Sequence, residues 1–160
     1  MPDTVFLDSR IEVTRPIPAP PSVIFDIVRS PAGHVAIDAS GMLQGFTGEP
    51  AEQAGDTFVI HMDRESLNDF PLGKYDVTIT IVTFDADREI AWKVGGNFDI
   101  GHIYGYRLAD VDGGTLVTSY YDWSQIDDNW RELAIFPVVP ESALRATLGI
   151  LARTVEPRRS

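Results

Sequence analysis

Three side chains that can both donate and accept hydrogen bonds, His102, Tyr104 and Tyr106, stand at every second position of the sequence. In a strand this spacing places all three on one face, together with Leu108. Histidine has an ordinary pKa close to neutral pH, and a tyrosine beside it can donate a proton or a hydrogen bond. His102 and Tyr106 are therefore the best candidates for catalytic acid–base groups. The alternative is that both are structural residues that bond to their neighbours.

The other two histidines suggest weaker hypotheses. His34 precedes Asp38 by four residues, so the two would share a helix face and could pair, or could make only a local cap or surface contact. His61 alternates with Ile60 and Met62 and is predicted to face away from them. Without cysteine and without a metal-ligand spacing between the histidines, the sequence predicts no metal site. No nucleotide-binding or nucleophile motif is present either, so no cofactor is predicted.

The charge balance excludes two kinds of partner. Aspartate and glutamate number 24 against 13 lysines and arginines, which gives a net charge of −11 over 160 residues. A nucleic acid or an anionic membrane surface would need a basic face, so neither is expected. No run approaches the roughly 18 apolar residues of a membrane span, and the start of the chain does not resemble a signal peptide. With no cysteine, these features fit a cytoplasmic protein.

The elements that must position these residues follow from periodicity and from turn residues. A strand at 10–16 is predicted to lead through prolines into two short helices, within 22–28 and 32–39. Six further strands are predicted at 42–46, 56–63, 74–84, 89–94, 100–109 and 115–123. Leucines at 144, 148 and 151 and Val155 then form one stripe of a long last helix. Small residues of that helix, including Ala143 and Ala146, predict either a close approach of backbone or a void.

Alternation along the predicted strands sorts side chains into two faces. The more aromatic and apolar set is assigned to the inside, where tyrosine and tryptophan can grip a ligand by an apolar body and orient it by a polar tip. Arg107 falls on the opposite, outward face. The alternative is that these side chains only fill the interior. The predicted ligand-binding set is Tyr75, Ile79, Trp92, His102, Tyr104, Tyr106, Tyr121, Trp123, Leu144 and Leu148.

Nearly the whole chain, from about residue 10 to residue 157, resembles the START-like superfamily (SRPBCC), and in particular its polyketide cyclase/dehydrase-like members. The resemblance rests on an ordered set of segments: PAPPSVIF at 18–25, SPAGHVAIDASG at 30–41, YRL at 106–108, GGT at 113–115 and YDW at 121–123, followed by the last helix. It implies one START-like domain over 1–160. The implied fold is α+β, a helix-grip: a curved antiparallel sheet of about seven strands around a long C-terminal helix, with two short helices after the first strand.

The resemblance implies an internal cavity and leaves its use open. The favoured function is binding of a small hydrophobic, largely uncharged molecule, lipid-like or of a polyketide or aromatic kind. The alternative is a polyketide cyclase, dehydratase or aromatase that uses acid–base groups in the same cavity. A third hypothesis is an interaction module working through its surface. The loop at 64–73, with Leu67, Phe70 and Leu72, could cap the cavity mouth or pack back on its own sheet. The apolar residues at 130–140 pose the same question, and if exposed they would form a partner or dimer surface. The sequence leaves the oligomeric state open.

Overall fold

The computed structural model describes residues 3–65, 73–96 and 100–155. In chain order its elements are β1 (Asp3–Leu7), β2 (Arg10–Ile17), α1 (Pro21–Val28), α2 (Pro31–Ile37), β3 (Leu43–Thr47), β4 (Thr57–Asp63), β5 (Lys74–Asp85), β6 (Glu89–Gly95), β7 (Ile103–Val111), β8 (Gly114–Asp122), α3 (Asp128–Arg131) and α4 (Glu141–Val155). None of the helices in this part of the chain is long and apolar enough to cross a membrane.

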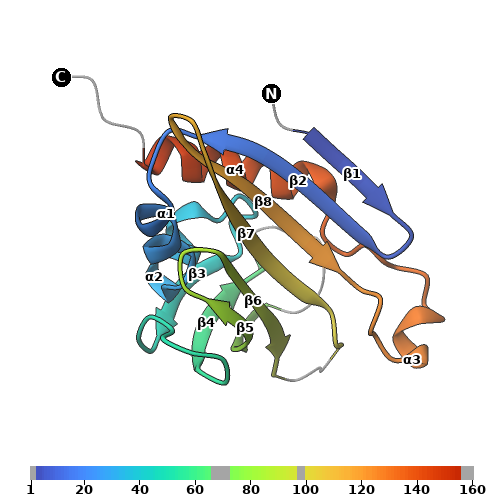
Figure 1. Ribbon diagram of the computed structural model, residues 1–160. Helices are drawn as coiled ribbons and strands as arrows, with labels where there is room; N and C mark the ends of the chain where they lie inside the picture. The colour runs from blue at the N-terminus through green and yellow to red at the C-terminus, as the bar shows by residue number, and fades with distance from the viewer. Residues whose placement is uncertain (1–2, 66–72, 97–99, 156–160) are drawn as a thin grey trace.

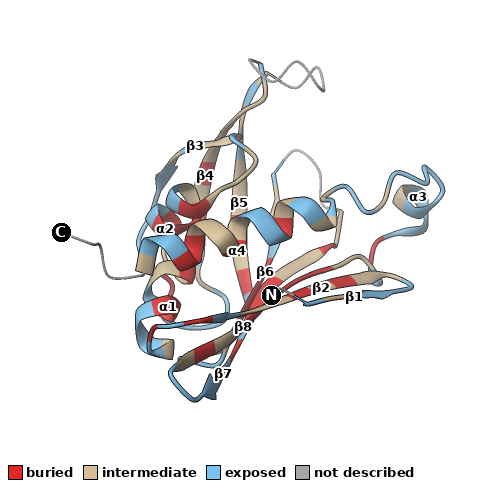
Figure 2. Cartoon of the chain, turned by 90° about the horizontal axis from the view of Figure 1, so that it is seen from above, coloured by how far each residue is buried: buried red, intermediate tan, exposed pale blue. Residues whose placement is uncertain are grey.

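All the strands join one antiparallel sheet in the order β1-β2-β8-β7-β6-β5-β4-β3. The strands from β3 to β8 follow one another as neighbours, and β2 returns to pair with β8. The sheet curves around α4, with α1 and α2 closing one end (Figure 1, Figure 2). The predicted α+β helix-grip fold is therefore confirmed.

The sheet has eight strands where the sequence predicted about seven. The additional strand is β1, which pairs with β2 at the edge of the sheet. Its apolar residues Val5, Phe6 and Leu7 are consecutive and all are exposed. They therefore lack the alternation that marks a half-buried strand in a sequence.

Prolines and one glycine set the two short helices. Pro21 occupies the first turn of α1 and Pro31 that of α2, where a missing N–H costs nothing. The Ser30 hydroxyl caps α2 by accepting a hydrogen bond from the Gly33 N–H at 3.5 Å. A Cβ added at Gly33 would lie 1.8 Å from the Ile27 carbonyl oxygen, so α2 approaches α1 as closely as only glycine permits.

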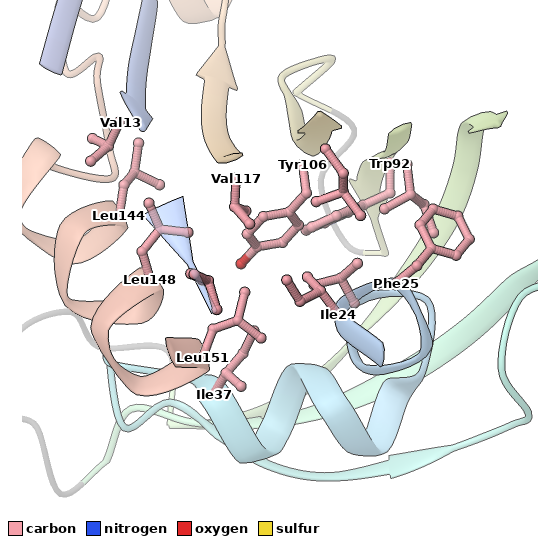
Figure 3. Packing of buried hydrophobic residues seen from close by; sticks show 14 of the residues in the cluster. Val13, Ile24, Phe25, Ile37, Trp92, Tyr106, Val117, Leu144, Leu148 and Leu151 are labelled. Atoms are coloured by element: carbon pink, nitrogen blue, oxygen red, sulfur yellow. The ribbon is translucent and has the colours of Figure 1, made fainter. Parts of the chain in front are cut away.

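The last helix packs its predicted stripe against the inside of the sheet. Leu144, Leu148 and Leu151 are buried, and the latter two are fully enclosed. Figure 3 shows Tyr106 reaching from β7 toward these leucines, with Val117 of β8 beside it. Burying a leucine side chain stabilises a fold by about 1.5–3 kcal/mol, so this stripe fixes the position of α4 over the sheet.

Candidate functional site

A cavity of about 220 Å³ lies between the inner face of the sheet, α2 and α4. The strands contribute mostly apolar and aromatic side chains, and the two helices supply its remaining sides. The residues around it include His34, Ile37 and Asp38 from the α2 region, Ile60, Val77, Ile79, Trp92, Val94, Tyr104, Tyr106 and Ser119 from the strands, and Ala143, Leu144 and Thr147 from α4. The predicted inner faces of β5, β6 and β7 thus meet in one enclosure.

Four rings form a continuous aromatic wall on one side of the cavity. Trp92 lies nearly parallel to Tyr104, with ring centroids 6.1 Å apart and planes 13° apart. Its ring also lies 5.8 Å from that of Tyr106 and 4.6 Å from that of His34. The pairing of β6 with β7 sets Trp92 opposite Tyr104, while His34 reaches the wall from α2. Such a wall offers flat apolar faces against which a planar molecule can stack.

His34 is held in this wall by a backbone hydrogen bond. Its Nε2 lies 2.7 Å from the carbonyl oxygen of Val28, the last residue of α1. The side chain is buried, and Phe58 packs edge-on against it with ring centroids 5.3 Å apart. Burial lowers the pKa of His34 from 6.5 to about 4, although the hydrogen bond to Val28 acts the other way. The imidazole is therefore neutral at neutral pH.

Asp38 does not pair with His34. The helix α2 ends at Ile37, and Asp38 has an extended backbone with ψ 123°, so it does not continue the helical face on which the pairing was predicted. Its Oδ1 accepts hydrogen bonds from the Ser40 N–H and hydroxyl at 2.9 and 2.6 Å. Its Oδ2 accepts one from the Leu43 N–H at 3.2 Å. The carboxylate thus lines the cavity while its hydrogen bonds are directed into the turn that leads to β3.

Tyr106 is the tyrosine that faces α4 across the cavity. Burial raises its pKa well above the ordinary value, the nearby Ser119 hydroxyl opposes that rise, and the charge of Asp38 adds to it. The hydroxyl therefore stays protonated at neutral pH. Its position between Ser119 and the α4 leucines makes it a polar group inside an apolar enclosure.

His102 belongs to a second cluster beside the cavity. Its Nδ1 lies 2.7 Å from the Tyr121 hydroxyl, and its ring packs edge-on against Tyr104 and Phe136. The Tyr121 ring also stacks on that of Tyr104, with centroids 4.6 Å apart. Burial lowers the pKa of His102 to about 4. The cluster ties the segment before α4 to the sheet.

The predicted site residues divide between the cavity and its surroundings. Five of them line it: Ile79, Trp92, Tyr104, Tyr106 and Leu144. His102 and Tyr121 form the adjoining cluster, with Trp123 5.4 Å from Tyr121 between ring centroids. Leu148 is enclosed in the core, and Tyr75 borders a shallow depression together with His61 and Asp76. His102 and Tyr106, the candidate acid–base groups, have no mutual contact in the described part of the chain.

The sequence did not identify several wall residues. His34, Met42 and Leu43 come from the α2–β3 region, and Val139 precedes α4. The one available signal was the run of small residues in the last helix, since Ala143 lines the cavity. Ala146 is exposed. Among the residues that the structure describes, no group of three histidine or acidic side chains is placed to hold a metal ion.

Two loop hypotheses have different outcomes. The predicted cap at 64–73 falls largely on residues 66–72, which lie outside the described residues. In the predicted partner segment at 130–140, Leu133, Ile135 and Val138 are exposed. Phe136 packs against His102, and Val139 lines the cavity. Part of this segment therefore packs against the cavity and its neighbouring cluster, and part is exposed.

No protein-family model matches this chain, and no curated protein matches its sequence. Solved structures do match its fold. Protein Ms6760 from Mycobacterium smegmatis is 16% identical with a TM-score of 0.67, and the match covers 96% of each chain. The AHSA1-like protein from Aeromonas hydrophila is 16% identical with a TM-score of 0.59 over 91% of each chain. The Aha1 dimer from Colwellia psychrerythraea is also 16% identical, with a TM-score of 0.59 over 92% of this chain and 96% of that one.

These similarities concern the fold. At 16% identity they carry no activity or ligand over to this chain. What the chain does must be argued from its own cavity.

Proposed function

We propose that this protein binds a small, uncharged, mostly apolar molecule built around a single ring, in the cavity between the sheet and α4. The observation that supports this most directly is the aromatic wall of His34, Trp92, Tyr104 and Tyr106 around a cavity of about 220 Å³. Ligand sites are typically concave, mostly apolar and equipped with a few polar groups. This cavity has all three properties.

The size of the cavity sets the size of the ligand. An apolar cavity of about 150 Å³ in another protein is large enough to bind benzene. A cavity of about 220 Å³ therefore fits one ring with a short substituent. A long acyl chain or a fused multi-ring polyketide would need the walls to move apart.

The charge state of the walls sets the charge of the ligand. His34 is neutral because its pKa is about 4, and Tyr104 and Tyr106 stay protonated because burial raises the pKa of each. The Asp38 carboxylate already accepts three hydrogen bonds from Ser40 and Leu43. An anionic ligand would lose its hydration without gaining a positively charged partner among these groups, so a neutral ligand is favoured over an anion.

The cyclase, dehydratase or aromatase hypothesis is the weaker proposal. Tyr104 of the cavity wall does stack on Tyr121, and the Tyr121 hydroxyl is hydrogen-bonded to His102, so acid–base groups lie beside the cavity. General acid–base catalysis works best with groups whose pKa lies near the working pH. Burial lowers the pKa of both His34 and His102 to about 4 and raises that of the tyrosines. The pKa values of these two histidines and of Tyr104 and Tyr121 are thus shifted away from neutral pH, which favours ligand binding over catalysis.

The proposal is tested by filling the cavity. Ala143→Leu adds three carbon atoms to a lining position on α4, whereas Ala146→Leu adds the same atoms to an exposed position one turn away. A panel of substituted benzenes, phenols and indole would be screened by saturation-transfer NMR and ranked by calorimetry. We expect wild type and Ala146→Leu to bind members of the panel, and Ala143→Leu to bind them at least about tenfold more weakly.

Two outcomes would count against the proposal. No binding of any panel member to the wild-type protein would overturn it. Equal affinities for the two leucine variants would place the binding elsewhere on the molecule. Thermal melting serves as the fold control, and Ala143→Leu should melt no lower than wild type because its added atoms occupy cavity space.

A further inference from the structure

We propose that His34 is the polar anchor of the cavity and that it selects ring compounds that carry a hydrogen-bond donor, a hydroxyl or an N–H group. This inference rests on the proposed function and adds the chemical class of the ligand. It follows from the protonation pattern of one imidazole and from the partners already taken by the polar groups around it.

The Val28 carbonyl fixes which imidazole nitrogen carries the proton. A carbonyl oxygen can only accept a hydrogen bond, so the His34 Nε2, 2.7 Å away, must be the N–H donor. The neutral ring carries one proton, and Nδ1 is therefore left with a lone pair. At this position His34 can accept a hydrogen bond and cannot donate a second one.

The lone pair of Nδ1 is not taken up by a hydrogen bond in the described part of the chain, because the one hydrogen bond of His34 found there is that of Nε2 to Val28. In the same part of the chain no fully enclosed side-chain nitrogen or oxygen lacks a hydrogen-bond partner. Nδ1 is therefore not fully enclosed, although the residue is only 8% exposed. Because the side chain lines the cavity, that is where its accessible atom can meet a ligand.

The neighbouring polar groups have partners of their own. Asp38 is bonded to Ser40 and Leu43. The Tyr106 hydroxyl lies close enough to Ser119 for that side chain to affect its pKa, and Tyr104 stacks on Tyr121. Because Nδ1 lies in a mostly apolar cavity and His34 is only slightly exposed, a ligand donor would replace the little water that can reach this acceptor. The match should therefore discriminate strongly against a ligand of equal shape that lacks the donor.

The rings around His34 restrict how the donor can approach. Trp92 and Phe58 pack against the imidazole with centroid distances of 4.6 and 5.3 Å, which fixes the ring plane. The bond to Val28 fixes its rotation within that plane. The acceptor is thus held in place before the ligand binds, and little ordering is left to oppose binding.

Two probes of matched shape test the inference. 4-Ethylphenol and 4-ethyltoluene differ by a hydroxyl in place of a methyl group, and calorimetry gives the ratio of their affinities for each protein. The variant His34→Phe keeps an aromatic ring in the wall but has no acceptor. We expect the preference for the phenol to fall by about tenfold or more from wild type to His34→Phe. His61→Phe makes the same exchange on the exposed face of β4 and should leave the ratio unchanged.

The outcomes separate this inference from the proposed function. If both probes bind and their affinity ratio is the same in wild type and His34→Phe, the anchor role is overturned while the binding function stands. If no panel compound binds at all, both fail. Nitrogen NMR of the wild-type imidazole provides evidence that does not depend on the variant folding. The His34 Nδ1 resonance should move with the phenol and not with the toluene, and equal responses to the two would refute the anchor.

Discussion

The outer face of the sheet pairs its charged side chains with one another, whereas the inner face presents mainly neutral ones to the cavity. On the outside, Arg10 bonds to Glu12 at 2.7 Å and to Asp122 at 3.1 Å, and Arg107 reaches Glu12 at 3.1 Å. The Arg10 guanidinium also lies 4.1 Å from the ring centroid of Tyr120. These ion pairs and the cation–π contact connect β2, β7 and β8 in one network.

His61 and His34 show the same contrast between the outside and the inside of the molecule. His61, on the outer face of β4, has both ring nitrogens engaged, Nε2 with the Thr47 hydroxyl at 2.9 Å and Nδ1 with Asp76 at 2.7 Å. His34, inside, has only its Nε2 engaged. Strand alternation places His61 on the outer face, whereas His34 comes from α2 and has one ring nitrogen without a hydrogen bond among the described residues. The polar groups of the outer face therefore serve the fold, and the single hydrogen bond of His34 is consistent with its proposed role as an anchor.

The largest effect is expected from a substitution that disturbs the contact positioning His34. Gly33→Ala would put a Cβ 1.8 Å from the Ile27 carbonyl oxygen, so α2 must move away from α1 and carry His34 away from Val28. We expect a loss of roughly 3 kcal/mol or more in the free energy of unfolding, measured by urea denaturation. Binding of the phenol probe should weaken with it.

Gly149→Ala is the matched control for that substitution. The nearest atom to an added Cβ there is Nη1 of Arg15 at 3.6 Å, an ordinary contact. Because alanine favours helix over glycine, this variant of α4 should gain up to about 1 kcal/mol. If Gly33→Ala proved as stable as Gly149→Ala, the close approach of α1 and α2 would not be what fixes His34.

Acid should weaken the inner face before it weakens the outer one. His34 and His102 have pKa values of about 4 in the folded protein against an ordinary 6.5. Well above pH 6.5 both histidines are neutral in the folded and in the unfolded protein, so pH does not change the free energy of unfolding through them. As the pH falls from 6.5 toward 4, the unfolded chain binds protons that the folded one does not, and stability declines. Between pH 7 and pH 5 the expected loss is about 2 kcal/mol per histidine.

Urea denaturation at a series of pH values measures this decline. His34→Phe and His102→Phe should each remove about half of it, whatever their effect on stability at pH 7. The outer carboxylate Asp122, whose pKa is lowered by Ser124 and Arg10 against the effect of burial, loses its contribution only below its ordinary value of 3.8. If the protein carrying both His34→Phe and His102→Phe lost as much stability with falling pH as wild type, other groups would be responsible for the decline.

The smallest effect on stability is expected from a substitution on the outer face. The Tyr120 ring covers Gly105, and its hydroxyl donates to Glu89 at 2.5 Å. Tyr120→Phe removes that hydrogen bond and should cost about 1 kcal/mol in the free energy of unfolding. Tyr120 also borders the cavity, but the hydroxyl that is removed bonds to Glu89, so the affinity for the single-ring probes should stay at the wild-type value. A changed affinity would show that the two faces are coupled through the sheet.

Much of the inner face could be predicted because strand alternation is a local property. Tyr104 and Tyr106 were assigned inward and Arg107 outward, and the structure places them so. His61 was predicted to face away from Ile60, and this is confirmed. The strand β1 was missed because its exposed apolar residues do not alternate.

The position of His34 could not be predicted from local spacing. A separation of four residues suggested Asp38 as its partner, but α2 ends before Asp38. The actual partner, the Val28 carbonyl, lies six positions earlier in a different helix. That contact depends on two helices meeting at Gly33, and the pattern of either helix alone carries no sign of it. The cavity residues of the α2–β3 region depend on the same packing.

The place of Trp92 in the cavity wall gives the protein a built-in optical sensor. Its indole is part of the surface that a ring compound would touch, with His34 and Tyr104 on either side. A bound ring would change the polarity around that indole and with it the colour and intensity of its emission. Replacing Trp123 and Trp130 by phenylalanine would leave this single emitter. Entry and exit of unlabelled ligands could then be timed as changes of light.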